Sequence, residues 1–197
     1  MAGYLSDREF TDYVHQHWAI PKIYTKIGWQ LVEVNKEQAL QQDLCHGIDY
    51  TLKNREGKII TVQERFREKK YRHYHDATLR FRRDNHIDPA QIESEFYKIK
   101  ADYLVYAVID GDKADTASIK GFIKGVILNI NFLQEKFKSG LLEIKPTGTV
   151  RCLRKGDKMI CPENQNPDGS SSFIPFDVRI IKSLWGTEAI LYQKGYY

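Results

Sequence analysis

Asp49 and the run of residues 62–67 (VQERFR) are the part of this chain whose residue types and spacing could do chemistry. Asp49 offers a carboxylate, Gln63 and the backbone carbonyl of Glu64 offer further oxygens, and Arg65 offers a cation. Mg²⁺ prefers oxygen ligands, and a nearby cation can balance the charge that develops on a phosphate during its hydrolysis. The pattern therefore predicts a divalent-metal site that acts on phosphodiester bonds.

The segments that carry these residues have the alternation of a β-hairpin. In residues 47–52 (GIDYTL) and 59–67, apolar side chains recur at every second position, which is the period of a strand with one buried face. Residues 54–58 (NREGK) lie between them and supply a turn that contains a glycine. We expect two antiparallel strands joined by this turn.

The apolar positions also select the register of the hairpin. If the apolar faces stay together, Thr51 pairs with Thr61 and Asp49 lies opposite Gln63. A slip by one residue would place Asp49 on the side of Val62 and Glu64 instead. In the preferred register Glu64 is the exception, because its carboxylate lies on the apolar side of the strand.

An acid after one strand, a hairpin, and a polar-x-basic triplet on the next strand resemble the PD-(D/E)xK nuclease superfamily. The Asp of residues 47–49 (GID) matches the first acid of that motif, and residues 63–65 (QER) match its second half. Gln63 stands where the motif has its second acid, a replacement known in that superfamily, and Arg65 stands where it has a lysine. The similarity covers residues 44–110 and includes the order of the elements.

The resemblance implies a hydrolase that cuts DNA with Mg²⁺, for which Mn²⁺ may substitute. It implies that Asp49, Gln63 and Arg65 are catalytic. The metal ligands that it implies are Asp49, Gln63, Glu64 and an acid of the first helix, either Glu9 or Asp12. Arg65 can hold a phosphate or orient a water molecule, whereas an arginine does not lose its proton to act as a base.

Basic residues mixed with aromatic ones follow the motif. The net charge of the whole chain is only +4. A phosphate backbone and exposed bases are bound by such mixtures, although a solvated strand face has a similar composition. The residues that we expect to contact nucleic acid are Arg67, Lys69, Lys70, Arg72, Arg80, Arg82 and Lys98.

Several further elements are predicted around the hairpin. A first helix is expected to begin at a cap on Ser6, with Glu9 in the capping-box position, and to end at or be interrupted by Pro21. Residues 76–84 (DATLRFRRD) read as a third strand. Asp88 and the following proline predict a second helix start, and residues 103–109 (YLVYAVI) predict a strand buried on both faces.

The rest of the chain predicts a mixed architecture. Residues 121–130 are expected to form a strand and residues 131–140 a short helix, and turn signals between short apolar runs predict C-terminal hairpins or edge strands. The fold class is therefore α/β with an α+β tendency. We expect a mixed central β-sheet flanked by helices, with a restriction-endonuclease-like core implied by the resemblance.

Length and composition favour one domain over residues 1–197, with a core at about 5–138 and a β-rich extension at about 141–197. No apolar run is long enough to span a membrane, and residues 1–10 lack the core of a signal peptide, so we expect a cytoplasmic protein. Cutting both strands of a duplex would favour a homodimer. The alternatives are an inactive nucleic-acid-binding module of the same fold and an interaction protein that binds an acidic partner.

Overall fold

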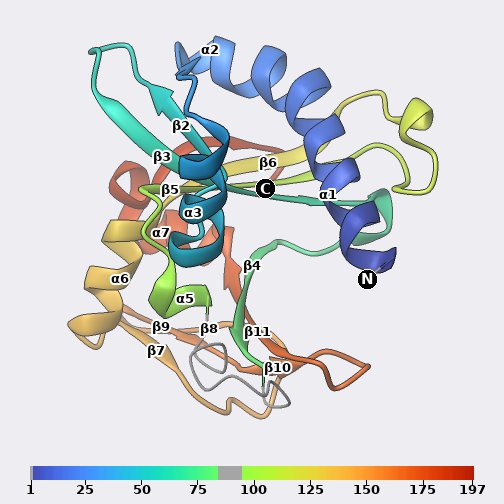
Figure 1. The fold of residues 1–197 in the computed structure, drawn as a ribbon. Helices are drawn as coiled ribbons and strands as arrows, with labels where there is room; N and C mark the ends of the chain where they lie inside the picture. The colour runs from blue at the N-terminus through green and yellow to red at the C-terminus, as the bar shows by residue number, and fades with distance from the viewer. Residues whose placement is uncertain (1, 84–94) are drawn as a thin grey trace.

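The computed structural model describes residues 2–83 and 95–197, and a six-stranded mixed sheet forms its centre (Figure 1). β3 and β5 are parallel, and the other neighbours in this sheet are antiparallel. In spatial order the strands are β1 (Gln30–Leu31), β2 (Tyr50–Lys53), β3 (Ile59–Arg67), β5 (Tyr103–Ile109), β6 (Phe122–Asn129) and β12 (Ile190–Lys194).

A continuous N-terminal helical segment covers one face of this sheet (Figure 1). It consists of α1 (Ala2–Val14), a π-helical stretch η1 (His15–Tyr24) and a last turn α2 (Thr25–Ile27). Its apolar side chains, such as Val14 and Ile23, pack in one cluster with Val62 of β3. The predicted start at Ser6 was wrong, because the helix begins before it. Of the two outcomes predicted at Pro21, the helix does not end there, but its α-helical geometry is interrupted by the π-helical stretch that contains Pro21.

The π-helical geometry explains how the helix passes Pro21. Proline has no N–H and crowds the preceding turn of an α-helix, and a π-helix bonds residues five apart in wider turns. The wider turn also changes which side chains share a face. Residues nine apart lie on opposite sides of an α-helix of 3.6 residues per turn, whereas His15 and Tyr24, at the two ends of η1, both point to the sheet and are buried.

The other face of the sheet packs in a second apolar cluster with helices and two small sheets. The helices are α5 (Glu95–Lys98), α6 (Ile130–Lys138) and α7 (Val178–Ala189). One small sheet consists of β10 (Asn164–Gln165), β11 (Ser172–Asp177) and β4 (Asp76–Arg82). The other consists of β7 (Leu142–Ile144), β9 (Lys158–Cys161) and β8 (Leu153–Lys155). A helix thus flanks each face of a mixed sheet, as the sequence predicted.

The predicted hairpin is confirmed in detail. Thr51 is the partner of Thr61, and Tyr50 is the partner of Val62. Along β3 the side chains alternate between buried and half-buried, and Glu64 is one of the buried ones. The hairpin was predictable because each strand has only one apolar face to bury.

Other predictions need correction. The third strand, β4, exists but pairs with β11 in a separate sheet. In the C-terminal segment β12 is an edge strand of the central sheet, one of the two predicted outcomes, whereas the helix α7 that precedes it was not predicted. The helix start predicted at Asp88 lies outside the described residues. Phe96 and Ile99, which follow that segment, are both buried.

Candidate active site

Asp49 is fixed by the end of one helix and the start of one strand. The helix α3 (Lys36–His46) begins at a cap on Asn35 and ends at Gly47, whose left-handed φ of 58° turns the chain toward the sheet. The amide of Asp49 donates to the carbonyl of Val62 at 2.9 Å. Its carboxylate Oδ2 accepts the amide of Glu64 at 2.6 Å. Asp49 therefore lies against the backbone of β3, just before β2 begins.

The surroundings of Asp49 disfavour its negative charge. Burial raises the pKa of this carboxyl from 3.8 to about 7, and the negative charges of Glu64 and Asp43 act in the same direction. The hydrogen bond from the Glu64 amide and the cation of Arg8 lower the pKa, but by less than burial raises it. A cation bound at Asp49 would favour its ionised form.

Glu64 lies on the opposite face of β3, under the N-terminal helix. Its side chain is fully buried, and its Oε1 accepts the hydroxyl of Tyr24 and lies 2.9 Å from Nδ1 of His15. A buried carboxylate needs such partners, because taking its charge out of water without them is costly. The carboxylate that was the exception in the strand pattern is thus held by the two ends of η1.

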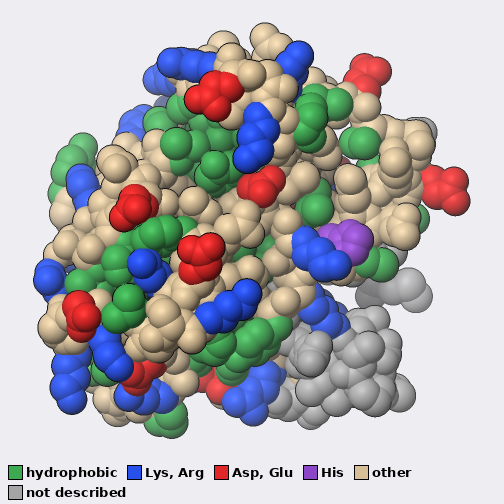
Figure 2. Space-filling model, turned by 90° about the vertical axis from the view of Figure 1, so that its left-hand side faces the viewer, with side chains coloured by type: hydrophobic (Ala, Val, Ile, Leu, Met, Phe, Trp, Pro, Cys, Tyr) green, Lys and Arg blue, Asp and Glu red, His purple; other side chains and the backbone are tan. Residues whose placement is uncertain are grey.

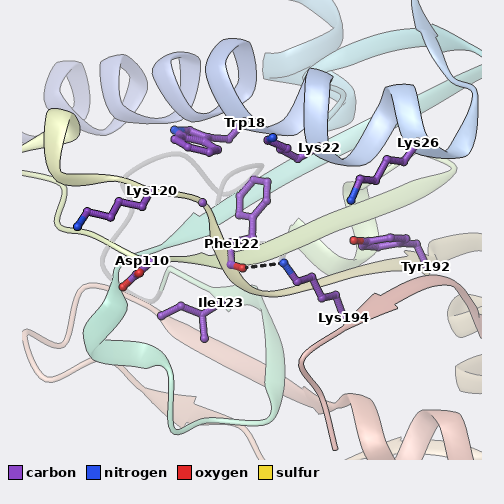
Figure 3. Close-up of a pocket in the computed structure, with 10 residues that line it drawn as sticks. Trp18, Lys22, Lys26, Asp110, Lys120, Phe122, Ile123, Tyr192 and Lys194 are labelled. Carbon is purple, nitrogen blue, oxygen red and sulfur yellow. Dashed lines mark hydrogen bonds between the residues drawn. The ribbon is translucent and has the colours of Figure 1, made fainter.

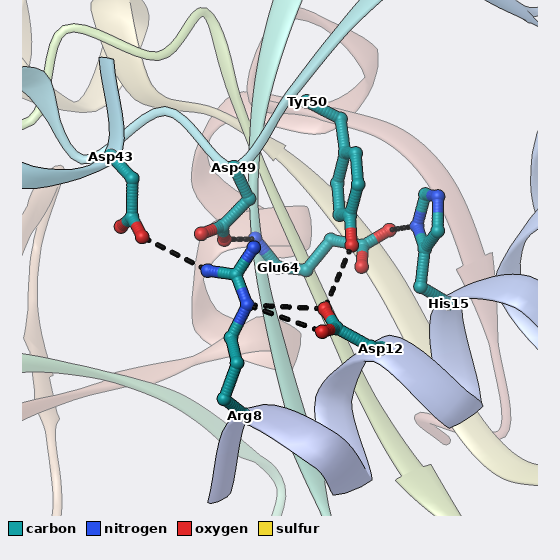
Figure 4. Close-up of polar contacts among 7 residues, drawn as sticks. All are labelled: Arg8, Asp12, His15, Asp43, Asp49, Tyr50 and Glu64. Atoms are coloured by element: carbon teal, nitrogen blue, oxygen red, sulfur yellow. Dashed lines mark hydrogen bonds and ion pairs between the residues drawn. The ribbon is translucent and has the colours of Figure 1, made fainter. Parts of the chain in front are cut away.

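A ring of polar contacts joins α1 to the start of β2 (Figure 4). The imidazole of His15 stacks on the ring of Tyr50 with centroids 3.5 Å apart, and the Tyr50 hydroxyl donates to Asp12 at 3.2 Å. Arg8 contacts Asp12 at 3.1 Å and Asp43 at 2.9 Å.

Figure 4 also shows the Arg8 guanidinium between Asp43, Asp12 and the carboxylate of Asp49. Three carboxylates from α1, α3 and the start of β2 therefore surround one organic cation. This grouping marks a place where positive charge is favoured.

The other predicted ligands are placed differently. Gln63 and Arg65 are half-buried on the face of β3 opposite Glu64, and the Gln63 amide lies close to Gly47. Glu9 is exposed on α1, whereas Asp12, the other acid considered for this helix, belongs to the polar ring. Asp49 contacts the backbone of Glu64.

The oxygen donors at Asp49 suit Mg²⁺ in type. Within residues 2–83 and 95–197, no three Asp, Glu, His or Cys side chains lie close enough together to hold a metal ion. Mg²⁺, however, is commonly held by only one or two carboxylates, with waters and substrate phosphates as its other ligands. The Asp49 carboxylate meets that requirement. On the opposite face of β3, Oε2 of Glu64 is a buried oxygen with no hydrogen-bond partner in the described part of the chain.

The predicted nucleic-acid contacts fall into two groups. Lys69 pairs with Asp110, Lys70 with Glu68, and Arg82 with Glu163, so the charge of these three is already balanced. Of the other four, Arg67 donates to Thr78 and Arg72 donates to His73, and Arg80 and Lys98 are half-buried on β4 and α5. On the face that Figure 2 shows, acidic and basic side chains are interspersed.

Comparison of the chain with protein-family models, curated proteins and solved structures finds no match. Among the described residues, no helix has both the length and the apolar character needed to cross a bilayer. The function is therefore argued from the site itself.

Sequence reasoning missed Arg8, His15, Tyr24 and Asp43. Their partners lie 35 to 49 positions away in the chain, so spacing along the sequence carries no signal for them. The one usable hint was Glu64, since an acid on a buried strand face requires polar partners from the element that covers it.

Proposed function

We propose that this protein is a metal-dependent nuclease that hydrolyses phosphodiester bonds in DNA, built on a restriction-endonuclease-like core. The observation that carries the proposal is the position of Asp49. Its carboxylate is partly buried, has its pKa raised to about 7, and is grouped with Asp12 and Asp43 around a cation. A carboxylate used only to hold a turn does not need other carboxylates beside it.

Asp49, the backbone carbonyl of Glu64 and the side chain of Gln63 are the groups that would hold Mg²⁺ in this proposal. When bound, Mg²⁺ lowers the pKa of a coordinated water and stabilises negative charge on the phosphate. Arg8 occupies part of the same negative region, so its side chain would have to move aside or share the carboxylates.

The residues of the chain itself have separate tasks in the proposed reaction. Asp49 must be deprotonated, and the Glu64 amide keeps its carboxylate in one orientation. Arg65, on the same side of β3 as Gln63, would hold the scissile phosphate by charge. The Glu64 side chain, tied to His15 and Tyr24, fixes β3 against the helix and takes no part in the proton transfer.

An inactive DNA-binding module is the second candidate, and one observation favours it. The only acid within residues 63–65 is directed into the protein interior, and the family lysine is replaced by Arg65, which supplies no base. This candidate predicts binding without cutting.

The test is a plasmid nicking assay with Mg²⁺ or Mn²⁺ that compares the wild type with Asp49→Asn. Asparagine keeps an oxygen that can accept the Glu64 amide, so the fold is preserved while the charge is removed. We expect the variant to lose at least about 100-fold in nicking rate, a typical order for a group that stabilises charge at the reacting centre.

Glu37→Gln is the matched control, because Glu37 is an exposed acid on α3 and the substitution removes the same charge. It is expected to cut like the wild type. DNA binding without cutting by the wild type would reject the nuclease and support the binding module. Equal nicking rates of the wild type and Asp49→Asn would show that Asp49 is not part of the catalytic site.

A further inference from the structure

A cavity lies between the N-terminal helical segment and the strands β6 and β12 (Figure 3). Its volume is about 380 Å³, within the range of pockets that take small molecules. Residues from η1, the loop before β6, and β12 line it. None of its lining residues belongs to the Asp49 site.

Lysines approach this cavity from two sides. Lys22 and Lys26 extend from the helical segment, and Lys194 extends from β12, where its Nζ donates to the carbonyl of Phe122 at 3.2 Å (Figure 3). Within the part of the chain that the structure describes, none of the three has a carboxylate within ion-pair distance. The acid at the cavity, Asp110, pairs with Lys69 at 2.9 Å. The cavity therefore carries an excess of positive charge.

The same helical segment also brings an aromatic ring. Trp18 precedes Lys22 and Lys26 at spacings of four, so the three line one side of this widened helix. Gly121, whose φ of 150° favours glycine, lies beside the Trp18 ring in the loop before β6. The rings of Phe122 and Tyr192 line the cavity as well. Charges for a phosphate and flat rings for stacking therefore occur together in this cavity.

We propose that this cavity binds a nucleoside phosphate, with the phosphate on Lys22, Lys26 and Lys194 and the base against the aromatic rings. Phosphate held by several ammonium groups and a base stacked on aromatic side chains are the usual means by which proteins hold nucleotides. The ligand is a free nucleotide or the 5′-phosphorylated end of a nucleic-acid chain. The site does not depend on a nuclease activity at Asp49.

The test is calorimetric titration of the full chain with AMP, adenosine and inorganic phosphate in metal-free buffer. We expect AMP to bind at least about tenfold more tightly than either part alone, because both the phosphate and the base make contacts. In a competition experiment, AMP is added to the protein bound to a 5′-phosphorylated single-stranded oligonucleotide. Displacement of the oligonucleotide by AMP would show that the cavity also accepts a chain end. Failure of AMP to displace it would assign the cavity to the free nucleotide.

The double variant Lys22→Ala/Lys26→Ala is expected to weaken AMP binding at least about tenfold, since it removes two charge-assisted contacts. The matched control is Lys155→Ala/Lys182→Ala, which removes two exposed lysines from β8 and α7 and should bind AMP within about twofold of the wild type.

Trp18→Leu removes an aromatic ring from the cavity wall, and is expected to bind AMP several-fold more weakly. Asp49→Asn should bind AMP like the wild type, which separates this site from the proposed nuclease. The proposal would be overturned if neither AMP nor the oligonucleotide binds, or if AMP and inorganic phosphate bind with equal affinity. It would also be overturned if the two double variants lose AMP affinity equally.

Discussion

At the scale of single residues, the carboxylates of Glu64 in β3 and of Asp49 just before β2 have different surroundings. Glu64 is fully buried and receives the hydroxyl of Tyr24 and the contact with His15, which compensate for its loss of water. Asp49 receives one backbone amide, and its burial raises its pKa to about 7, with the neighbouring carboxylates of Glu64 and Asp43 acting in the same direction. Glu64 therefore has the partners of a residue that holds the fold, whereas Asp49 is the carboxylate that we propose binds a cation.

The raised pKa of Asp49 predicts how stability depends on pH. The folded pKa of about 7 lies above the ordinary value of 3.8, so the folded state binds more protons than the unfolded state between these values. The free energy of unfolding contributed by Asp49 therefore falls as pH rises from about 4 to about 7. In metal-free buffer at pH 8, Asp49→Asn should be more stable than the wild type by at least about 1 kcal/mol in urea unfolding. Parallel pH profiles for the two proteins would show that Asp49 ionises normally.

The network around Glu64 predicts a large loss of stability on its removal. Glu64→Ala leaves His15 and Tyr24 buried without their shared acceptor, and should lower the free energy of unfolding by roughly 3 kcal/mol. Urea denaturation monitored by circular dichroism measures this change. Glu33→Gln, at an exposed position, serves as control and should change the free energy by less than about 0.5 kcal/mol. If Glu64→Ala lowers the free energy of unfolding no more than Glu33→Gln does, the structural role of Glu64 is contradicted.

At the scale of elements, the parts of the fold that depend on one strand's own pattern were predictable. The β2–β3 register followed from apolar alternation, because a slip would expose one strand's buried face. The continuation of the first helix through Pro21 was not predictable, since proline normally ends an α-helix and the π-helical turn depends on packing against the sheet. The same holds for the candidate site. Asp49 could be predicted from its spacing to residues 63–65, whereas the contacts of His15 and Tyr24 with Glu64 depend on tertiary packing and could not.

The helix α7 was missed because no turn separates it from β11. Asp177 is both the last residue of that strand and the cap of the helix, and its carboxylate accepts the amides of Arg179 and Ile180. Asp177→Ala should therefore cost about 1–2 kcal/mol of unfolding free energy, the usual value of such a cap. Thermal and urea unfolding would measure it, with Asp157→Ala at an exposed position as the control. Equal stability of the two variants would mean that α7 does not need its cap.

At the scale of the whole molecule, charge limits how the protein can hold DNA. The net charge is +4, and three of the seven predicted contacts, Lys69, Lys70 and Arg82, already pair with acids. Electrostatic attraction therefore comes from the remaining basic residues, together with any ion pair that opens on binding.

Three of the other predicted contacts, Arg67, Arg72 and Lys98, predict a moderate salt dependence for duplex binding. Each neutralised phosphate contributes a slope near −0.9, so log K against log salt should have a slope of about −2 to −3. Fluorescence anisotropy with a labelled duplex between low and physiological salt measures this slope. A slope near −6 would mean that the ion pairs open to bind DNA, and a slope near zero would favour an acidic protein as partner.

The most direct measurement of the central claim is the binding of Mn²⁺ to the metal-free protein at pH 8, followed by electron paramagnetic resonance. We predict one site with a Kd below about 1 mM in the wild type, weakened at least about tenfold in Asp49→Asn but not in Glu37→Gln. Binding should also weaken as pH falls through about 7, because the Asp49 carboxyl then takes up a proton. Equal Mn²⁺ affinity in the wild type and Asp49→Asn, or no Mn²⁺ binding by either, would contradict the account.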